Sequence, residues 1–176
     1  HRWDGAAWTE RGTVGGAVRQ LVVHDFTLLI AAADGLHRID MATADPPAPV
    51  AGLPAGPVNR LWQAPDGAWW CATDNGIHRS AAIGDAATDI RTDGRYLWVG
   101  GDDAGALLLG GDDGLLHYDA GNDVAHRYQG LEFSETEPDW ESAGGPAADP
   151  GLPTVLCARR DRTGTLWIGT EAGLAA

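Results

Sequence analysis

The sequence contains no lysine, so all 12 of its basic residues are arginine, and they face 25 Asp and Glu residues. The resulting formal net charge of −13 would repel a polyanion, so we expect no nucleic-acid binding. No run approaches the roughly 20 apolar residues of a membrane helix, so no membrane insertion is expected either.

Motifs that carry catalysis or hold a cofactor are also missing. There is no nucleophile elbow, no phosphate-binding loop and no dinucleotide-binding fingerprint. No H-E-x-x-H motif, Cys/His ligand spacing or EF-hand loop occurs. We therefore assign no catalytic residue, no metal site and no cofactor, and we favour a protein that is not an enzyme.

The composition leaves little room for helices. Its 25 Gly and 10 Pro interrupt nearly every window that is long enough for three helical turns. Residues 17–34 are an exception and could form a helical stripe, although their β-branched and aromatic content favours strands. Asp-Gly pairs and Asn75-Gly76 favour tight hairpin turns. The sequence therefore predicts an all-β protein with many short antiparallel strands.

A repeat with a period near 40 organises the chain. Four segments share one frame, namely residues 27–40, 68–81, 106–119 and 165–176. A period of about 40 residues with four strands per unit is typical of a β-propeller blade. We predict one domain over residues 1–176, a β-propeller of four blade repeats with an insertion at 130–153. The predicted inner strands are 17–23, 58–64, 95–101 and 154–160.

The two ends of the chain are expected to share one blade. The last repeat stops soon after its third strand begins, and His1-Arg2-Trp3-Asp4 matches His37-Arg38-Ile39-Asp40 of the first repeat. We expect residues 1–12 to complete the last blade, so that pairing of the terminal segments closes the ring. The alternatives are a piece of a larger propeller, or two chains that form an eight-bladed ring.

The repeat resembles that of a known family. DRTGTLWIGTEAGL (161–174) is similar to the repeat of the two-component-regulator propellers, and APDGAWWCATDNGIHR (64–79) matches nearly as well. DDAGALLLGGDDGLLHYD (102–119) keeps the glycines and loses the Trp. The resemblance implies a ligand-sensing bacterial β-propeller that often recognises saccharides. It also implies an extracytoplasmic location, periplasmic or secreted, and a signalling partner.

The starts of the inner strands carry the best candidate for a binding site. When these strands are aligned on Leu21, Leu61, Leu97 and Leu156, polar residues fall at equivalent positions that ring one mouth of the channel. Three Arg at a mouth would suit carboxylate, sulfate or phosphate groups. The alternative is that each Arg pairs with a nearby turn Asp. The predicted ligand-binding residues at the mouth are Arg19, Gln20, Asn59, Arg60, Arg95 and Tyr96.

Other notable residues have simpler explanations. Trp140 lies in the insertion, where no repeat explains it, and it joins the predicted ligand-binding set. Trp62, Trp70, Trp98 and Trp167 occupy repeated columns and are expected to pack between blades. Two cysteines, at 71 and 157, are expected to be buried thiols rather than a disulfide. Acidic turn residues and repeated His-Arg pairs fit turn chemistry and blade duplication.

The leading hypothesis is a non-catalytic ligand-binding or sensor propeller for a saccharide or an anionic small molecule. A carbohydrate-active hydrolase or lyase is the first alternative, because the insertion holds carboxylates that could act as a pair. These are Glu132, Glu135, Glu137, Asp139, Glu141 and Asp149. The second alternative is a structural or assembly module, a homodimer or part of a larger ring.

Overall fold

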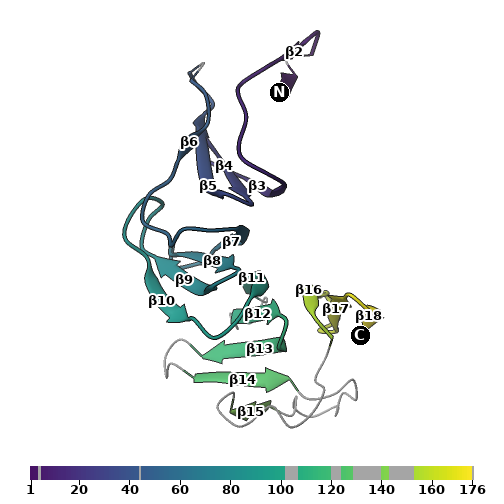
Figure 1. Ribbon diagram of the computed structural model, residues 1–176. Coiled ribbons are helices and arrows are strands. Elements are labelled where there is room, and N and C mark those ends of the chain that lie inside the picture. Colours follow the sequence, from purple (N-terminus) through teal and green to yellow (C-terminus); the bar gives the residue numbers. More distant parts are fainter. Residues whose placement is uncertain are drawn as a thin grey trace.

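The computed structural model describes residues 1–3, 5–43, 45–101, 107–119, 124–128, 140–142 and 153–175. All regular secondary structure in these ranges is β, as predicted (Figure 1). No described segment forms a helix of the length and apolarity that would span a membrane.

Four antiparallel sheets follow one another along the chain, which we number first to fourth. The first contains β3 (Val18–His24), β4 (Thr27–Ala32), β5 (Gly35–Asp40) and β6 (Ala48–Pro49). The second contains β7 (Val58–Gln63), β8 (Trp69–Thr73), β9 (Gly76–Ser80) and β10 (Thr88–Arg91). The third contains β11 (Tyr96–Gly101), β12 (Leu107–Gly111), β13 (Gly114–Asp119), β14 (Val124–Tyr128) and β15 (Trp140–Ser142). The fourth contains β16 (Val155–Arg160), β17 (Leu166–Thr170) and β18 (Gly173–Ala175).

The inner strands β3, β7, β11 and β16 agree with the predicted ranges to within one residue at each end. The helical alternative for residues 17–34 is wrong, because β3 and β4 form a hairpin there. Gly76 shows why the turn after the second strand needs glycine. Its φ is 136°, and a Cβ at this position would overlap the carbonyl oxygen of Arg91.

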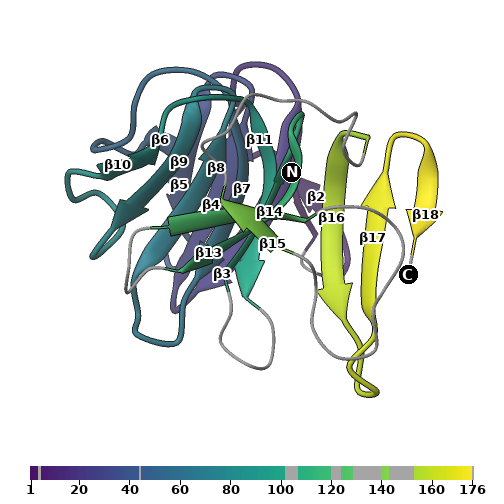
Figure 2. The ribbon, with the colours of Figure 1, turned by 90° about the horizontal axis from the view of Figure 1, so that it is seen from below.

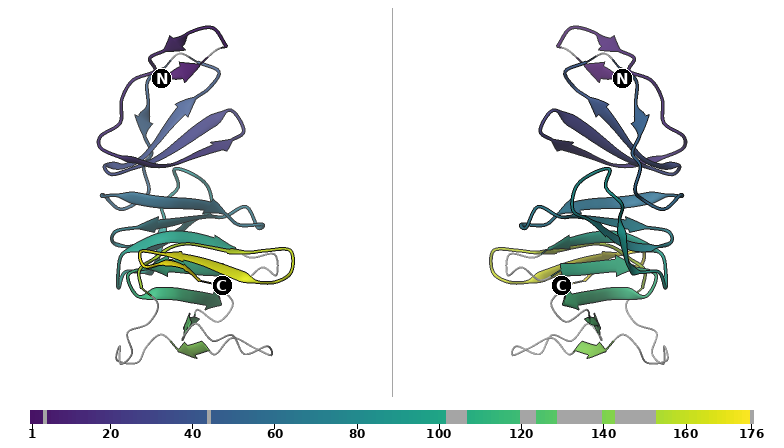
Figure 3. Two further views of the ribbon diagram at one scale, coloured as in Figure 1. Left: turned by 90° about the vertical axis from the view of Figure 1, so that its right-hand side faces the viewer. Right: turned by 90° about the vertical axis from the view of Figure 1, so that its left-hand side faces the viewer.

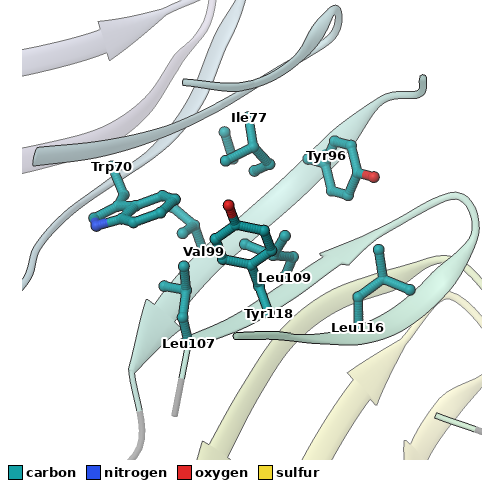
Figure 4. Close-up of a cluster of buried hydrophobic side chains, with 9 residues drawn as sticks. Trp70, Ile77, Tyr96, Val99, Leu107, Leu109, Leu116 and Tyr118 are labelled. Atoms are coloured by element: carbon teal, nitrogen blue, oxygen red, sulfur yellow. The ribbon is translucent and has the colours of Figure 1, made fainter. Parts of the chain in front are cut away.

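Apolar side chains between adjacent sheets hold the stack together. Between the second and third sheets, Trp70 meets Tyr118 edge to face, with ring centroids 5.8 Å apart (Figure 4). Corresponding clusters join the first sheet to the second and the third to the fourth. Trp98 is buried, and Trp62 packs against the central cluster, so their predicted packing between blades is confirmed.

The sheets form an open arc. Their inner strands contact one another in the order β3, β7, β11 and β16. Figures 2 and 3 show β16–β18 beside the third sheet, and Figure 3 shows the N-terminal hairpin beyond the first. That hairpin, β1 (Arg2–Trp3) with β2 (Trp8–Thr9), is a separate two-stranded sheet. The predicted pairing of the terminal segments is therefore not formed among the described strands, since each sheet packs only against its neighbours in sequence.

The open arc corrects two expectations about burial. Trp167 occupies the position equivalent to that of the buried Trp70, yet it is 41% exposed because no further described sheet covers the fourth one. Cys157 is exposed for the same reason, so only Cys71 is a buried thiol. The two cysteines form no disulfide, as expected.

Candidate functional site

Each inner strand has a β-bulge near its N-terminal end, and the bulge sets which residues are equivalent. The pairing with the second strand shifts between Val58 and Arg60 in β7, and at the matching place in the other three inner strands. The extra residues of the four bulges are Arg19, Asn59, Leu97 and Leu156.

This register shows that the predicted alignment is wrong for the third and fourth inner strands. Tyr96 pairs with Gly111 as Val58 pairs with Thr73, so Tyr96 is equivalent to Val58 and not to Arg60. Arg95 therefore lies just before β11, and Thr154-Val155 shifts in the same way. Leu97 and Leu61 are not equivalent, because Leu97 is the extra residue of a bulge whereas Leu61 pairs with Cys71.

Arg95 is paired with an acidic turn residue of its own sheet. Its Nε and Nη2 donate to the two carboxylate oxygens of Asp112 at 2.9 and 2.8 Å. These hydrogen bonds raise the pKa of Arg95 and lower that of Asp112. The carboxylates of Asp74 and Glu171 also raise the pKa of Arg95, which places three acidic turns near this guanidinium.

Arg19 is paired as well, across two sheets. Its Nη1 lies 3.4 Å from Oδ1 of Asp74, the turn residue of the second sheet. Asn59 donates to the same oxygen at 2.8 Å. For Arg19 and Arg95, therefore, the alternative that mouth arginines pair with turn aspartates is confirmed.

Two predicted site residues tie neighbouring inner strands together. The side-chain amide of Gln20 donates to the carbonyl of Leu61 at 3.2 Å and accepts from its N–H at 2.6 Å. Asn59 donates to the carbonyl of Tyr96 at 2.6 Å, linking the second sheet to the third. These amides hold the inner strands in place.

Tyr96 points into the core and away from the predicted mouth. Its ring is buried in the central cluster, and its hydroxyl donates to Asp93 at 3.1 Å and accepts from Nε of Arg91 at 2.9 Å. Burial raises the pKa of Tyr96 to about 12. This residue organises the loop before β11 rather than offering a free hydroxyl.

Arg60 is the exception among the three arginines. It forms no hydrogen bond or ion pair with any described residue, and its buried Nε has no partner. The side chain is half-buried, and by strand alternation it lies on the same side of β7 as Trp62, which packs toward the third sheet. Beside it, the buried Oδ1 of Asn59 also lacks a partner. One donor and one acceptor are thus left unsatisfied at adjacent positions.

The remaining predicted site residues lie in the insertion, of which the structure describes residues 140–142 and 153. Trp140 begins β15 and is opposite Tyr128 of β14, so the insertion adds a fifth strand to the third sheet. The side chain of Trp140 lies outside the described residues. The same holds for the carboxylates proposed as a catalytic pair in the insertion.

One polar cluster was not recognised from the sequence. Thr73 Oγ1 lies 3.1 Å from Nε2 of buried His78, whose Nδ1 lies 2.8 Å from Asp89. The order hydroxyl, imidazole, carboxylate matches a nucleophilic triad. However, this hydroxyl is buried and also donates to the carbonyl of Gly76, and Thr170 makes the corresponding bond to Gly173 without any His. The cluster therefore serves the turn.

Acidic turn residues bond partly within their own turns, as predicted, and partly to neighbouring segments. Asp34 accepts from the N–H of Gly15 and contacts His37, and these contacts lower its pKa, the one to His37 most. Asp66 accepts from the N–H of Ala68, which lowers its pKa together with Arg79. Within the described ranges, no three His, Cys, Asp or Glu side chains gather as metal ligands would.

No protein-family profile and no curated protein matches the chain. Solved structures do match. The extracellular domain of a proposed one-component system from B. thetaiotaomicron is 15% identical, covers 90% of this chain and gives a TM-score of 0.57. The extracellular domain of a proposed hybrid two-component system from the same organism is 15% identical, covers 89% and gives 0.53.

This chain spans only 26% of the length of each of these two structures. At this identity the likeness concerns the fold, which is propeller-like and is shared with extracellular domains of bacterial regulators. It supports, at the level of the fold, the resemblance to the two-component-regulator propellers.

Proposed function

We propose that this protein is a non-catalytic, extracytoplasmic ligand-binding module that senses an anionic small molecule, such as an acidic saccharide. The observation that carries the proposal is the unpaired Arg60 next to Asn59. Arg19 and Arg95 are occupied by Asp74 and Asp112, so Arg60 is the mouth arginine whose guanidinium is available to a ligand.

The chemistry of the pair suits a sugar acid. A guanidinium fork binds a carboxylate or sulfate through two parallel hydrogen bonds, and an amide oxygen accepts from a sugar hydroxyl. The surrounding acidic turns favour a small ligand with a single negative group over a polyanion, which they would repel. The fold likeness to extracellular sensor domains supports the sensor role and the location, and a signalling partner is then required.

The test is a binding measurement with glucuronate, galacturonate, inorganic sulfate and neutral glucose, by thermal shift and calorimetry. A sugar acid should raise the melting temperature, and Arg60→Gln should weaken its binding about 10- to 100-fold, because a charged hydrogen bond is lost. Arg95→Gln is the matched control and should bind within about threefold of the native chain, since Asp112 already occupies that guanidinium.

Equal losses in Arg60→Gln and Arg95→Gln would contradict the proposal, because they would indicate a general effect of net charge. Binding of glucose as tight as that of glucuronate would also contradict it. A thermal shift by sulfate alone, with none by the sugar acids, would reduce the site to a simple anion site.

A further inference from the structure

The outer face of the first sheet is apolar and open. Leu21 is 59% exposed and Val23 is 64% exposed, although both alternate with residues that pack against the second sheet. The position of Leu21 is covered in the other sheets, where its equivalents Leu61, Val99 and Ala158 are buried under the preceding sheet. The first sheet therefore presents the face that each later sheet buries.

The face of the fourth sheet that points away from the third sheet is also open. Trp167 and Leu174 are 41% and 71% exposed. The residues at equivalent positions in the first sheet, Leu29 and Leu36, are buried against the second sheet. The fourth sheet therefore leaves exposed the face that each earlier sheet packs against the next sheet in the chain.

A cavity marks where a sheet would enter. It has a volume of about 540 Å³ and lies over the open face, where Val18, Leu21, Leu28 and Ile30 of the two inner strands line it together with Ile39, Met41 and Pro47 farther out. The segment that carries β1 and β2 borders the cavity through Arg2 and Arg11. A further sheet placed against this face would therefore continue the stacking seen between the other sheets.

We infer that this further sheet is the fourth sheet, β16–β18, of a second copy of this chain. The contact repeats the interface that joins the first sheet to the second, with the fourth sheet of one copy in the role of the first. Two such contacts, related by a twofold axis, close a ring of eight sheets and cover both apolar faces. This inference is independent of the ligand proposed above.

The repeat specifies a contact that can be tested. Gln20 bonds to the backbone of Leu61 across the interface between the first and second sheets. In the strand register, Cys157 of the fourth sheet is equivalent to Gln20, and Leu21 of the first sheet is equivalent to Leu61. Cys157 of one copy should then face Leu21 of the other. Leu21→Cys, an exposed substitution that leaves the core intact, should give a disulfide-linked dimer of about 37 kDa, twice 18.4 kDa, under mild oxidation.

Two controls keep the result specific. Leu21→Cys combined with Cys157→Ser should give no cross-link, and neither should Phe26→Cys, whose side chain is 75% exposed in the turn at the far end of β3. By light scattering the native chain should have the dimer mass, and Leu21→Arg should halve it.

Three outcomes would overturn the inference. A dimer that persists without Cys157 would mean that two first-sheet faces pair with each other. An internal disulfide at the monomer mass would mean that one chain closes its own ring of four sheets. A monomeric native chain with no cross-link would mean that the apolar faces meet a different occupant.

Discussion

The side chain of Gln20 bonds to Leu61 in the way that a neighbouring strand would, accepting from its N–H and donating to its carbonyl. Leu61 belongs to β7, the innermost strand of its sheet, which has no strand partner within the sheet on its axial side. A single amide of the preceding sheet thus replaces two ladder hydrogen bonds at an open strand edge.

Gln20→Ala should therefore destabilise the fold more than an ordinary surface change. We expect a loss of about 1–3 kcal/mol in the free energy of unfolding, because two backbone groups of buried Leu61 lose their partners. Gln63→Ala is the matched control, since that exposed amide makes one bond to Gly67 and should cost less than about 0.5 kcal/mol. Urea unfolding followed by Trp fluorescence measures both, and equal losses would contradict the role of Gln20.

Asp161 should make stability sensitive to strong acid. It accepts from the hydroxyl of Thr163 and from Nε1 of Trp167, and the first of these does most to lower its pKa from 3.8 to about 2. Because the folded pKa is the lower one, the stabilisation is complete above about 3.8 and is lost as the pH falls to about 2. Thr163→Val should raise the pKa of Asp161, measured by NMR titration of its carboxyl carbon. An unchanged titration would show that the hydroxyl does not bind the carboxylate.

Gly76→Ala should be severely destabilising, by at least about 2 kcal/mol. The new methyl group would overlap the carbonyl of Arg91, and the φ of 136° disfavours any L side chain. Gly94→Ala should change stability by less than about 0.5 kcal/mol, since its Cβ would meet only a carboxylate oxygen of Asp113 at 3.5 Å. Thermal unfolding measures the stability of both variants. If Gly76→Ala were as stable as the native chain, the C-terminal end of β10 would have to move freely.

Cys71 should be inert in the folded protein. Burial raises the pKa of its thiol to about 12, so almost no thiolate forms near neutral pH. In a Cys157→Ser variant, Ellman's reagent should therefore react with no thiol until denaturant is added, and then with one. Rapid reaction of this variant without denaturant would show that the interface between the first and second sheets opens.

Replacing Arg60 should not weaken the ligand-free protein. Its guanidinium has no partner among the described residues, so Arg60→Met should leave stability unchanged or raise it by up to about 1 kcal/mol. Arg95→Met removes two bonds to Asp112 and should lower stability by up to about 1 kcal/mol, because the pair is exposed. A larger loss for Arg60→Met would mean that this arginine has a structural partner.

Much of the fold could be predicted because single residues specify where the turns lie. Asn75-Gly76 supplies a positive φ that β8 and β9 require, and apolar columns such as Trp70 and Leu108 mark strands covered on both faces. These signals are local, so a repeat of about 40 residues was enough to locate the inner strands.

The site was less predictable because its geometry is not local. The bulge adds one residue without a composition signal, so Leu97 could be mistaken for the equivalent of Leu61. Which arginine stays unpaired depends on turns from other sheets, as the bond from Arg19 to Asp74 shows. Burial of Trp167 depends on whether another sheet follows, which the column itself does not encode.

Because each sheet, in the part of the chain that the structure describes, is packed only against its sequence neighbours, the arc is a linear array whose members depend on the sheets beside them. The second and third sheets are sandwiched, whereas the outer two are supported from one side. Backbone amides of β8 and β12 should therefore exchange with deuterium most slowly, and those of β3 and β17 should exchange first, through partial opening that leaves the middle of the array folded.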